Sequence, residues 1–213
     1  RGERLQEFGE RTAFILFTDI YRSTQLWEKF PRDFVRSLEL HNSLVEDTIL
    51  SHSGEIMKNL GDGYIAIFDS PDDCVRSGVE VQKKLRDIQP LPDGSDILVR
   101  IVGHGGPLQP LAAGHGYFGR PLNRASRICQ VCHPGQVLVS DEVTARLAQA
   151  PEEVEILDLG VHHLRDLAEP ERLYQVDHPS FKLHKFPPLP TLEYRPNNLV
   201  YQPNTFIGRE KEH

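Results

Sequence analysis

A short continuous apolar run near the amino end of the chain, AFILF at residues 13–17, most constrains the fold. A run with this pattern is typical of a strand that is buried on both faces of a sheet. Extended segments and helical segments alternate along the rest of the chain, and some neighbouring strands are joined as hairpins. The sequence therefore predicts an α/β sandwich (α+β in its layering), in which helices pack on one mixed β-sheet.

Turn residues and periodic apolar positions divide the chain into short elements. Helices are predicted after Ser23, after Pro31, from Ser70 to about residue 88, after Pro121, and over 141–149. Strands are predicted at 13–17, 55–59, 64–68, 97–103, 136–140, 154–160 and 172–176. The segment Leu60-Gly61-Asp62-Gly63 between two of these strands indicates a hairpin with Asp62 at its tip, and glycines at 103–119 indicate a loop.

Composition excludes several classes of function. The chain has 213 residues, 38% of them hydrophobic, which suits one sizeable core. A net charge of −7 argues against a broad nucleic-acid footprint. No stretch approaches the roughly 18 apolar residues of a membrane span, and the amino end lacks the apolar core of a secretory signal. Three cysteines are too few for a disulfide framework, so a reducing compartment, the cytoplasm, is expected.

Two aspartates occupy similar positions, each where an apolar run meets a turn. Asp19 lies in FTDIYRST (17–24), and Asp62 lies in KNLGDGY (58–64) with Lys58 four residues before it. Carboxylates placed in this way collect hard metal ions. A metal pair beside a phosphate-sized loop suggests phosphoryl or nucleotidyl transfer. In the helix after Pro121, Asn123 and Arg127 are four residues apart and so share one face.

Three segments in this order, FTDIYRST, KNLGDGYIAIF and YFGRPLNRASR (117–127), resemble the catalytic domain of class III adenylyl and guanylyl cyclases. The resemblance covers residues 12–177, and residues 1–11 form a lead-in. Each segment alone is a weak signal, but three in order form a strong one. The resemblance implies the class III cyclase fold, with a ferredoxin-like mixed sheet, and a reaction that converts ATP into 3′,5′-cyclic AMP and pyrophosphate.

The resemblance also implies roles for the metal and phosphate residues. Asp19 and Asp62 would bind two Mg²⁺ or Mn²⁺ ions with help from the backbone carbonyl of Ile20. Phosphate oxygens would be held by backbone amides at a helix start, around Tyr21, Arg22, Ser23 and Thr24.

For the nucleoside and the reacting phosphate, the resemblance implies four further roles. Arg127 would neutralise charge that builds on the α-phosphate, and Asn123 would orient the ribose. Lys58 would donate a hydrogen bond to the base edge and favour adenine, since guanylyl members typically carry a glutamate there. Arg165, in GVHHLRDL, is a candidate for the terminal phosphates, although a surface ion pair is an equal alternative.

In this family one chain supplies the aspartates and its partner supplies the lysine, the asparagine and the arginine. This chain carries both sets, so the resemblance implies an isologous homodimer with two composite sites.

The sequence departs from the family pattern at Gly116. An aspartate that accepts from the adenine amino group commonly stands seven residues before the position of Asn123. Glycine offers no side-chain acceptor, so base discrimination would fall to Lys58, backbone carbonyls or a neighbour such as His115. ATP stays the expected substrate; relaxed base specificity, or a regulatory domain that binds nucleotide without turnover, are the alternatives.

Composition changes from about residue 178, where proline and asparagine become frequent and no apolar period is sustained. Residues 178–213 are interpreted as a linker or a wrapping tail. The segment RPNNLVYQPNTFIGREKEH resembles the stretch that precedes a P-loop ATPase module in large bacterial regulators. A downstream ATPase domain is therefore expected as a partner in the same chain.

Several residues also allow plainer interpretations. If each is considered alone, Asp19 is better explained as a helix cap and Asp62 as a turn residue, and only their combination with the other site residues favours the functional interpretation. Asn123, Arg127 and Lys58 are ordinary surface residues on that view. The segment Cys129–His133 matches the CxxCH pattern of haem attachment, but no export signal accompanies it, and buried thiols fit better. Adjacent histidines at 162 and 163 point different ways on a strand, which disfavours a shared metal. A polymerase-like or cyclic-dinucleotide synthase palm also uses a carboxylate pair, but this sequence lacks the GGDEF-type hairpin that such synthases show.

Overall fold

The structure is a computed structural model that describes residues 11–111 and 116–192. A single sheet forms its centre, with strand order β2-β3-β1-β4-β6-β8-β7 and a short β5 paired to β4. The mixed sheet with packed helices that the sequence predicted is confirmed. Its strands are β1 Arg11–Ile20, β2 Glu55–Asn59, β3 Tyr64–Phe68, β4 Val99–Pro110, β5 Tyr117–Phe118, β6 Val137–Ser140, β7 Glu155–His162 and β8 Glu171–Asp177.

The sheet is antiparallel except for β4 and β6, which pair in parallel. The β1 strand lies at its centre, between β3 and β4. Because β1 is covered on both faces, its apolar run AFILF is buried throughout except for Phe17, which is half-buried. Helices α1 Ser23–Lys29, α2 Pro31–Ser51, α3 Pro71–Leu85, α4 Arg120–Val131 and α5 Asp141–Thr144 connect the strands.

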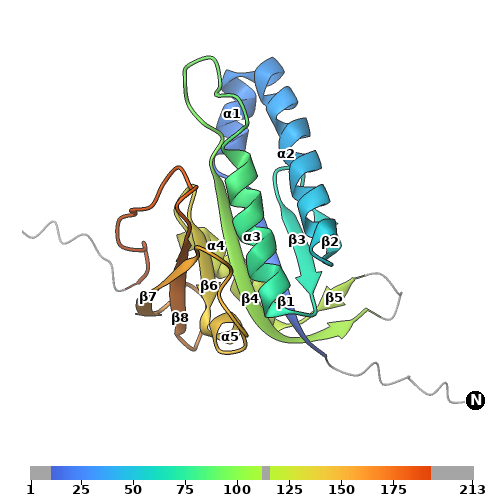
Figure 1. The fold of residues 1–213 in the computed structure, drawn as a ribbon, viewed down its shortest axis with the longest axis vertical. Helices are drawn as coiled ribbons and strands as arrows, with labels where there is room; N and C mark the ends of the chain where they lie inside the picture. Colours follow the sequence, from blue (N-terminus) through green and yellow to red (C-terminus); the bar gives the residue numbers. More distant parts are fainter. Residues whose placement is uncertain (1–10, 112–115, 193–213) are drawn as a thin grey trace, which may run out of the picture.

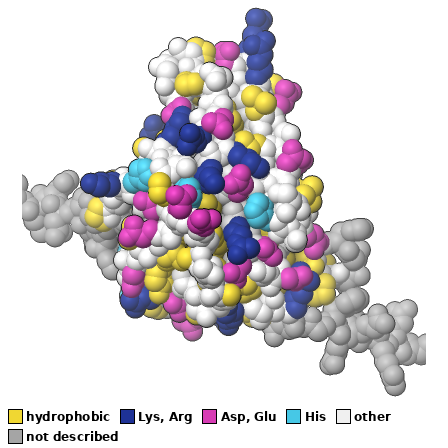
Figure 2. Space-filling model, viewed as in Figure 1, with side chains coloured by type: hydrophobic (Ala, Val, Ile, Leu, Met, Phe, Trp, Pro, Cys, Tyr) yellow, Lys and Arg dark blue, Asp and Glu magenta, His cyan; other side chains and the backbone are white. Residues whose placement is uncertain are grey.

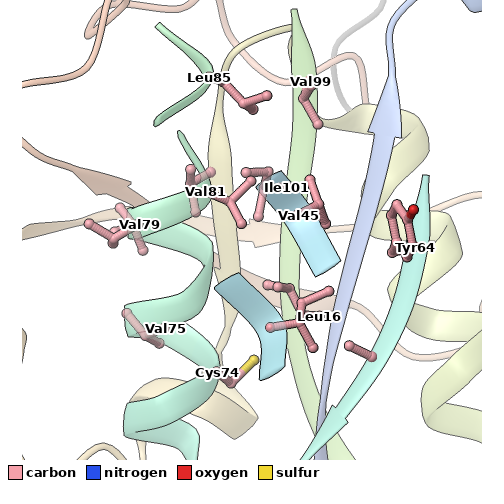
Figure 3. Close-up of a cluster of buried hydrophobic side chains, with 14 of the residues drawn as sticks. Leu16, Val45, Tyr64, Cys74, Val75, Val79, Val81, Leu85, Val99 and Ile101 are labelled. Atoms are coloured by element: carbon pink, nitrogen blue, oxygen red, sulfur yellow. The ribbon is translucent and has the colours of Figure 1, made fainter. Parts of the chain in front are cut away.

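Helices α2 and α3 lie side by side on one face of the sheet, and α4 packs on the other (Figure 1). Figure 3 shows the larger core, in which Leu16 of β1 and Ile101 of β4 meet Val45 of α2 and Cys74 of α3. On the opposite face, residues of α4 such as Ile128 pack against Leu138 of β6. The alternation along β1 divides its side chains between these two layers.

The predicted glycine-rich loop at 103–119 was wrong in its first half, because β4 continues to Pro110. The glycines of this segment lie within β4, where they allow neighbouring side chains to pack closely against the strand, and they do not form a turn. A Cβ on Gly105 would lie 3.0 Å from the ring of Phe14, and Gly105 is the residue paired with Phe14 across the strands. A glycine inside a strand often marks a close approach of this kind.

The helix predicted at 141–149 is shorter in the structure and ends at Thr144. The side chain of Asp72, from α3, accepts hydrogen bonds from the backbone N–H groups of Ala148 (3.2 Å) and Gln149 (3.4 Å). These amides therefore bind a side chain instead of continuing the helix.

Residues 178–192, predicted as part of a linker or a wrapping tail, pack on the sheet. Phe181 is 6% exposed and joins the larger core, while Leu189 is 4% exposed and packs on the α4 side. We refer to residues 178–192 as the strap. The wrapping alternative therefore describes this part of the tail, and residues 193–213 lie outside the described residues.

On the face seen in Figure 2, Lys and Arg side chains are interspersed with Asp and Glu side chains instead of forming one basic field. Over residues 11–111 and 116–192, no helix combines the length and the apolar character that a bilayer crossing requires.

Candidate active site

Asp19 and Asp62 meet at the end of β1, although 43 positions separate them along the chain. The backbone N–H of Ile20 donates to the backbone carbonyl of Asp62 at 2.9 Å, which ties the tip of the β2–β3 hairpin to the strand end. The hydroxyl of Ser23, the first residue of α1, donates to Oδ2 of Asp62. A strand end, a hairpin tip and a helix start therefore form one group.

Gly63 explains why the hairpin tip can come so close to β1. A Cβ at this position would lie 2.0 Å from the backbone oxygen of Thr18, a separation that no side chain tolerates. The hydroxyl of Thr18 also accepts a hydrogen bond from the backbone N–H of Tyr64, at 3.0 Å. The glycine after Asp62 is thus required for the approach of the two carboxylates.

A hydrogen-bond network around the buried Tyr64 supports the hairpin. The hydroxyl of Tyr64 donates to Glu46 of α2 at 2.7 Å and accepts from the amide of Asn59 at 3.0 Å. The side-chain oxygen of Asn59 in turn accepts from the backbone N–H of Gly61, at 2.7 Å. Burial and the neighbouring Glu46 raise the pKa of Tyr64 well above its usual value, so it stays protonated and keeps its donor role.

Arg100 is a residue of this site that the motif analysis missed. Its guanidinium forms an ion pair with Asp19, in which Nε lies 2.9 Å from Oδ2 and Nη2 binds the same oxygen. The two residues are direct partners in the antiparallel pairing of β1 and β4. A single arginine inside the apolar run ILVRIVG was the available signal, because a charge in a central strand requires a partner.

The pKa of Asp19 is raised above its ordinary value. Burial is the largest cause, the ion pair with Arg100 opposes it, and the charge of Asp62 adds to it. Two carboxylates that repel each other in a half-buried place favour a cation between them.

The donor set fits a hard divalent cation. Asp19 and Asp62 offer carboxylate oxygens, and Ile20 offers a backbone carbonyl, which are the ligands preferred by Mg²⁺. No group of three or more His, Cys, Asp or Glu residues suited to a metal occurs within 11–111 and 116–192. The pair would therefore leave positions for substrate oxygens or water, as Mg²⁺ bound with substrate phosphates usually does.

The predicted phosphate loop lies beside the carboxylates. Its helix, α1, has seven residues, no side chain caps its amino end, and its first turn holds no acidic residue. Arg22 precedes it with a left-handed φ of 57°. The backbone N–H of Tyr21 is already bound to the carbonyl of Leu98 at 2.8 Å, so in this structure that amide does not face an anion.

Asn123 and Arg127 lie together on α4, away from contact with the carboxylates. Among the described residues, neither forms a hydrogen bond or an ion pair with Asp19 or Asp62. Nη2 of Arg127 lies 2.9 Å from Oδ2 of Asp166, and Asn123 is exposed. Arg165 is exposed in the same segment as Asp166.

Lys58, which is predicted to read the base, and Gly116, which occupies the other base-reading position of the family pattern, lie on different elements. Lys58 is exposed on β2 and forms no ion pair with another described residue. Gly116 has φ 100°, and its carbonyl accepts from the backbone N–H of Leu111 at 3.0 Å, which closes the loop between β4 and β5. An aspartate is disfavoured in this conformation, so the backbone itself accounts for glycine here. His115 lies outside the described residues.

Neither alternative metal motif forms a site. Cys129 and Cys132 are each 4% exposed, and burial raises the pKa of both thiols, that of Cys129 to about 12. Inert buried thiols of this kind agree with a structural role. The Nδ1 and Nε2 atoms of His162 lie 3.2 Å from the Thr191 hydroxyl and 3.0 Å from the Leu159 carbonyl, so both ring nitrogens have partners.

Comparisons with known proteins agree on one family. A profile of the adenylate and guanylate cyclase catalytic domain matches residues 6–177. An uncharacterized protein of Mycobacterium tuberculosis is 32% identical over 208 residues, covering 94% of this chain and 68% of that protein. An adenylate cyclase of Neurospora crassa is 27% identical, covering 76% of this chain but 9% of the larger enzyme.

Solved structures share the fold. Adenylate cyclases from Trypanosoma brucei in their monomeric state match with a TM-score of 0.75 at 23% identity, covering 84% of this chain and 94% of that chain. An adenylate/guanylate cyclase/hydrolase from Silicibacter pomeroyi matches with a TM-score of 0.65 at 28% identity, covering 78% and 96%. The chain therefore belongs to the adenylate and guanylate cyclase catalytic domain family.

Proposed function

We propose that the chain is a nucleotidyl cyclase that converts ATP into 3′,5′-cyclic AMP and pyrophosphate, with two divalent metal ions, at a site shared between two copies. The observation that carries the proposal is the convergence of Asp19 and Asp62 at the end of β1, in a member of the cyclase family.

Asp19 and Asp62, with the Ile20 carbonyl, would hold two Mg²⁺ or Mn²⁺ ions. Such ions supply Lewis-acid activation of the ribose 3′-hydroxyl and neutralise the triphosphate. The hairpin contacts of Gly63 and Ser23 keep the carboxylates in place before substrate arrives, which reduces the reorganisation that the reaction requires.

The second set of residues handles the nucleotide. Arg127 places a fixed positive charge where negative charge develops on the α-phosphate, and Asn123 orients the ribose so that its hydroxyl faces that phosphate. Arg165 and the amides of Arg22, Ser23 and Thr24 bind the remaining phosphates, whereas the Tyr21 amide stays bound to the Leu98 carbonyl. Lys58 donates to the base and favours adenine.

The ion pairs of the single protomer support a two-copy site. The guanidinium that contacts Asp19 within one protomer belongs to Arg100, whereas Arg127 pairs with Asp166. One chain therefore does not bring Arg127 to its own carboxylates, and a second copy would supply it. An isologous dimer closes two such sites by symmetry.

Activity with the four nucleoside triphosphates tests the proposal. The purified chain, incubated with Mn²⁺ and ATP, is expected to yield cyclic AMP and pyrophosphate, and Asp62→Ala is expected to abolish the product. Glu152→Ala, an exposed change outside the site, is the matched control and should leave turnover unchanged. Absence of a cyclic product from all four triphosphates, at concentrations where the protein is dimeric, would refute the enzymatic proposal.

Complementation tests the shared site. An equal mixture of inactive Asp62→Ala and Arg127→Ala, which keeps only a small residual activity, forms heterodimers in about half of the pairs, and each heterodimer has one intact site of two. About a quarter of the original activity is therefore expected to return. No recovery from a mixture that demonstrably exchanges subunits would argue for a site within one chain.

Gly116 favours a second candidate, a regulatory domain that binds nucleotide and controls a downstream ATPase without turnover. A glycine with φ 100° cannot supply the acceptor that reads adenine in the family pattern. Tight binding of a non-hydrolysable ATP analogue that shifts dimerisation, with no product, would favour this candidate. For either function we propose a reducing compartment, the cytoplasm, because all three cysteines are free and buried.

A further inference from the structure

The guanidinium of Arg127 is held at one edge by a carboxylate from outside its helix. Nη2 lies 2.9 Å from Oδ2 of Asp166, and Nη1 lies 3.3 Å from the side-chain oxygen of Gln130. The Nε atom of the same guanidinium is buried and has no hydrogen-bond partner among the described residues. The Arg127 guanidinium is therefore held through its Nη atoms, while its Nε–H group donates no hydrogen bond to the described residues.

Asp166 has a backbone conformation that disfavours most side chains. Its φ of 62° lies in the left-handed region, which costs a non-glycine residue free energy. The Asp166 carboxylate is 60% exposed, and an exposed ion pair adds little to stability. Stability therefore gives no strong reason for a carboxylate at this position.

The segment between β7 and β8 is anchored to α4, which fixes where Asp166 lies. Leu164 is 1% exposed and packs in the same cluster as Ile128 of α4. Arg124, one turn before Arg127, pairs with Glu169 at 2.8 Å and with Glu171. The segment that carries Asp166 therefore contacts α4 both before Asp166, through Leu164, and after it, through Glu169 and Glu171.

We infer that Asp166 is a positioning residue, whose carboxylate orients the Arg127 guanidinium toward the charge that develops on the α-phosphate. This inference rests on the function proposed above. A charged group that is already oriented stabilises the transition state without being ordered during the reaction. An Arg127 side chain without this partner would sample other rotamers, and turnover would fall while nucleotide binding stayed nearly intact.

Two substitutions separate this role from a structural one. Asp166→Asn keeps the shape and tolerates the left-handed conformation but removes the charge, and Asp166→Gly removes the side chain while relieving the backbone. Both are expected to lower kcat about tenfold with little change in KM. The melting temperature of Asp166→Gly should not fall below that of the unaltered protein. Asp158→Asn is the matched control, because Asp158 pairs with Arg172 on the exposed β7–β8 hairpin and should leave kcat unchanged.

A double-mutant cycle tests whether Asp166 acts through Arg127. In an Arg127→Ala background, Asp166→Asn should cause no further loss of residual activity, since the group it orients is gone. An equal further loss in that background would overturn the inference, as would an unchanged kcat. A rise in kcat of Asp166→Asn would also overturn it, because the pair would then be an inhibitory contact that competes with substrate.

An NMR measurement distinguishes failure of the inference from failure of the proposed function. The Nε–H signal of Arg127, assigned by its loss in Arg127→Lys, should exchange faster with solvent in Asp166→Asn and not in Asp158→Asn. An unchanged exchange rate would refute the orienting contact whether or not the protein makes a cyclic nucleotide. If the exchange rate rises but the unaltered protein makes no product, the contact stands and the cyclase proposal fails.

Discussion

A buried histidine gives the fold a defined sensitivity to acid. His104 lies on β4, is 2% exposed, and places Nδ1 2.8 Å from the hydroxyl of Ser140. Burial and the nearby charge of Arg124 lower the pKa of His104 to about 4. The side chain is therefore neutral in the folded protein at pH 7, whereas an unfolded chain gives histidine a pKa of about 6.5.

The direction of the effect follows from proton binding. As the pH falls below about 6.5, the unfolded chain takes up a proton at this residue and the folded chain does not, so the folded state loses stability until the pH reaches about 4. Between pH 7 and pH 5 the free energy of unfolding is expected to fall by about 2 kcal/mol through His104 alone. Above pH 7 the contribution of His104 is constant.

Urea unfolding at pH 7 and pH 5 measures this loss. In His104→Gln, whose amide can still bond to Ser140, the fall between the two pH values should be about 2 kcal/mol smaller than in the unaltered protein. Leu192→Gln changes a side chain that is 59% exposed and cannot titrate, and it is the control that should keep the full pH dependence. The reasoning is refuted if His104→Gln loses as much stability on acidification as the unaltered protein, because another group would then carry the proton uptake.

Two further predictions concern the hairpin and the strap. Gly63→Ala should destabilise the fold by at least about 3 kcal/mol, because the new Cβ would meet the backbone oxygen of Thr18 at 2.0 Å, whereas Gly61→Ala, with φ 92° and open space, should cost only about 1 kcal/mol. Equal melting temperatures for the two variants would contradict the contact. Leu189→Ala should cost about 2–5 kcal/mol in urea unfolding, since this side chain is 4% exposed in the α4-side core, and Leu192→Ala, 59% exposed, should cost almost nothing. A negligible effect of Leu189→Ala would show that the strap is not packed in solution.

Local patterns in the sequence predicted the fold well where a few neighbouring residues decide the structure. The strands predicted at 55–59 and 64–68 are β2 and β3 with the same bounds, and Asp62 lies in the turn between them. Alternation, caps and turn glycines act within a few residues of each other, so the sequence shows them directly. The convergence of Asp19 and Asp62 could also be expected, since one ends a central strand and the other ends a hairpin.

Contacts between distant segments escaped sequence reasoning. Arg100 and Asp19 are 81 positions apart, and their pairing depends on the register of β1 and β4, which no local motif specifies. The strap has no helical or strand period, yet Leu189 and Phe181 are buried. Asp166 carried no signal, because a left-handed aspartate in a loop is distinguishable only once its φ is known. Burial of single side chains depends on the tertiary fold rather than on neighbours in sequence.

The ion pair between Asp19 and Arg100 affects how a metal ion would enter the proposed site. Asp19 is half-buried with Arg100, and a partly buried carboxylate left without a cation is strongly destabilising. Within the protomer, Arg100 already balances the charge of Asp19, so this carboxylate does not need a metal ion as its counter-charge. If Asp19 holds a metal ion as proposed, the ion must compete with the guanidinium for Oδ2, and Arg100 is released beside an anionic substrate. Removal of Arg100 would then strengthen the binding of the metal ion, which isothermal titration with Mn²⁺ measures. The same change would lower the free energy of unfolding of the metal-free protein, which urea unfolding measures.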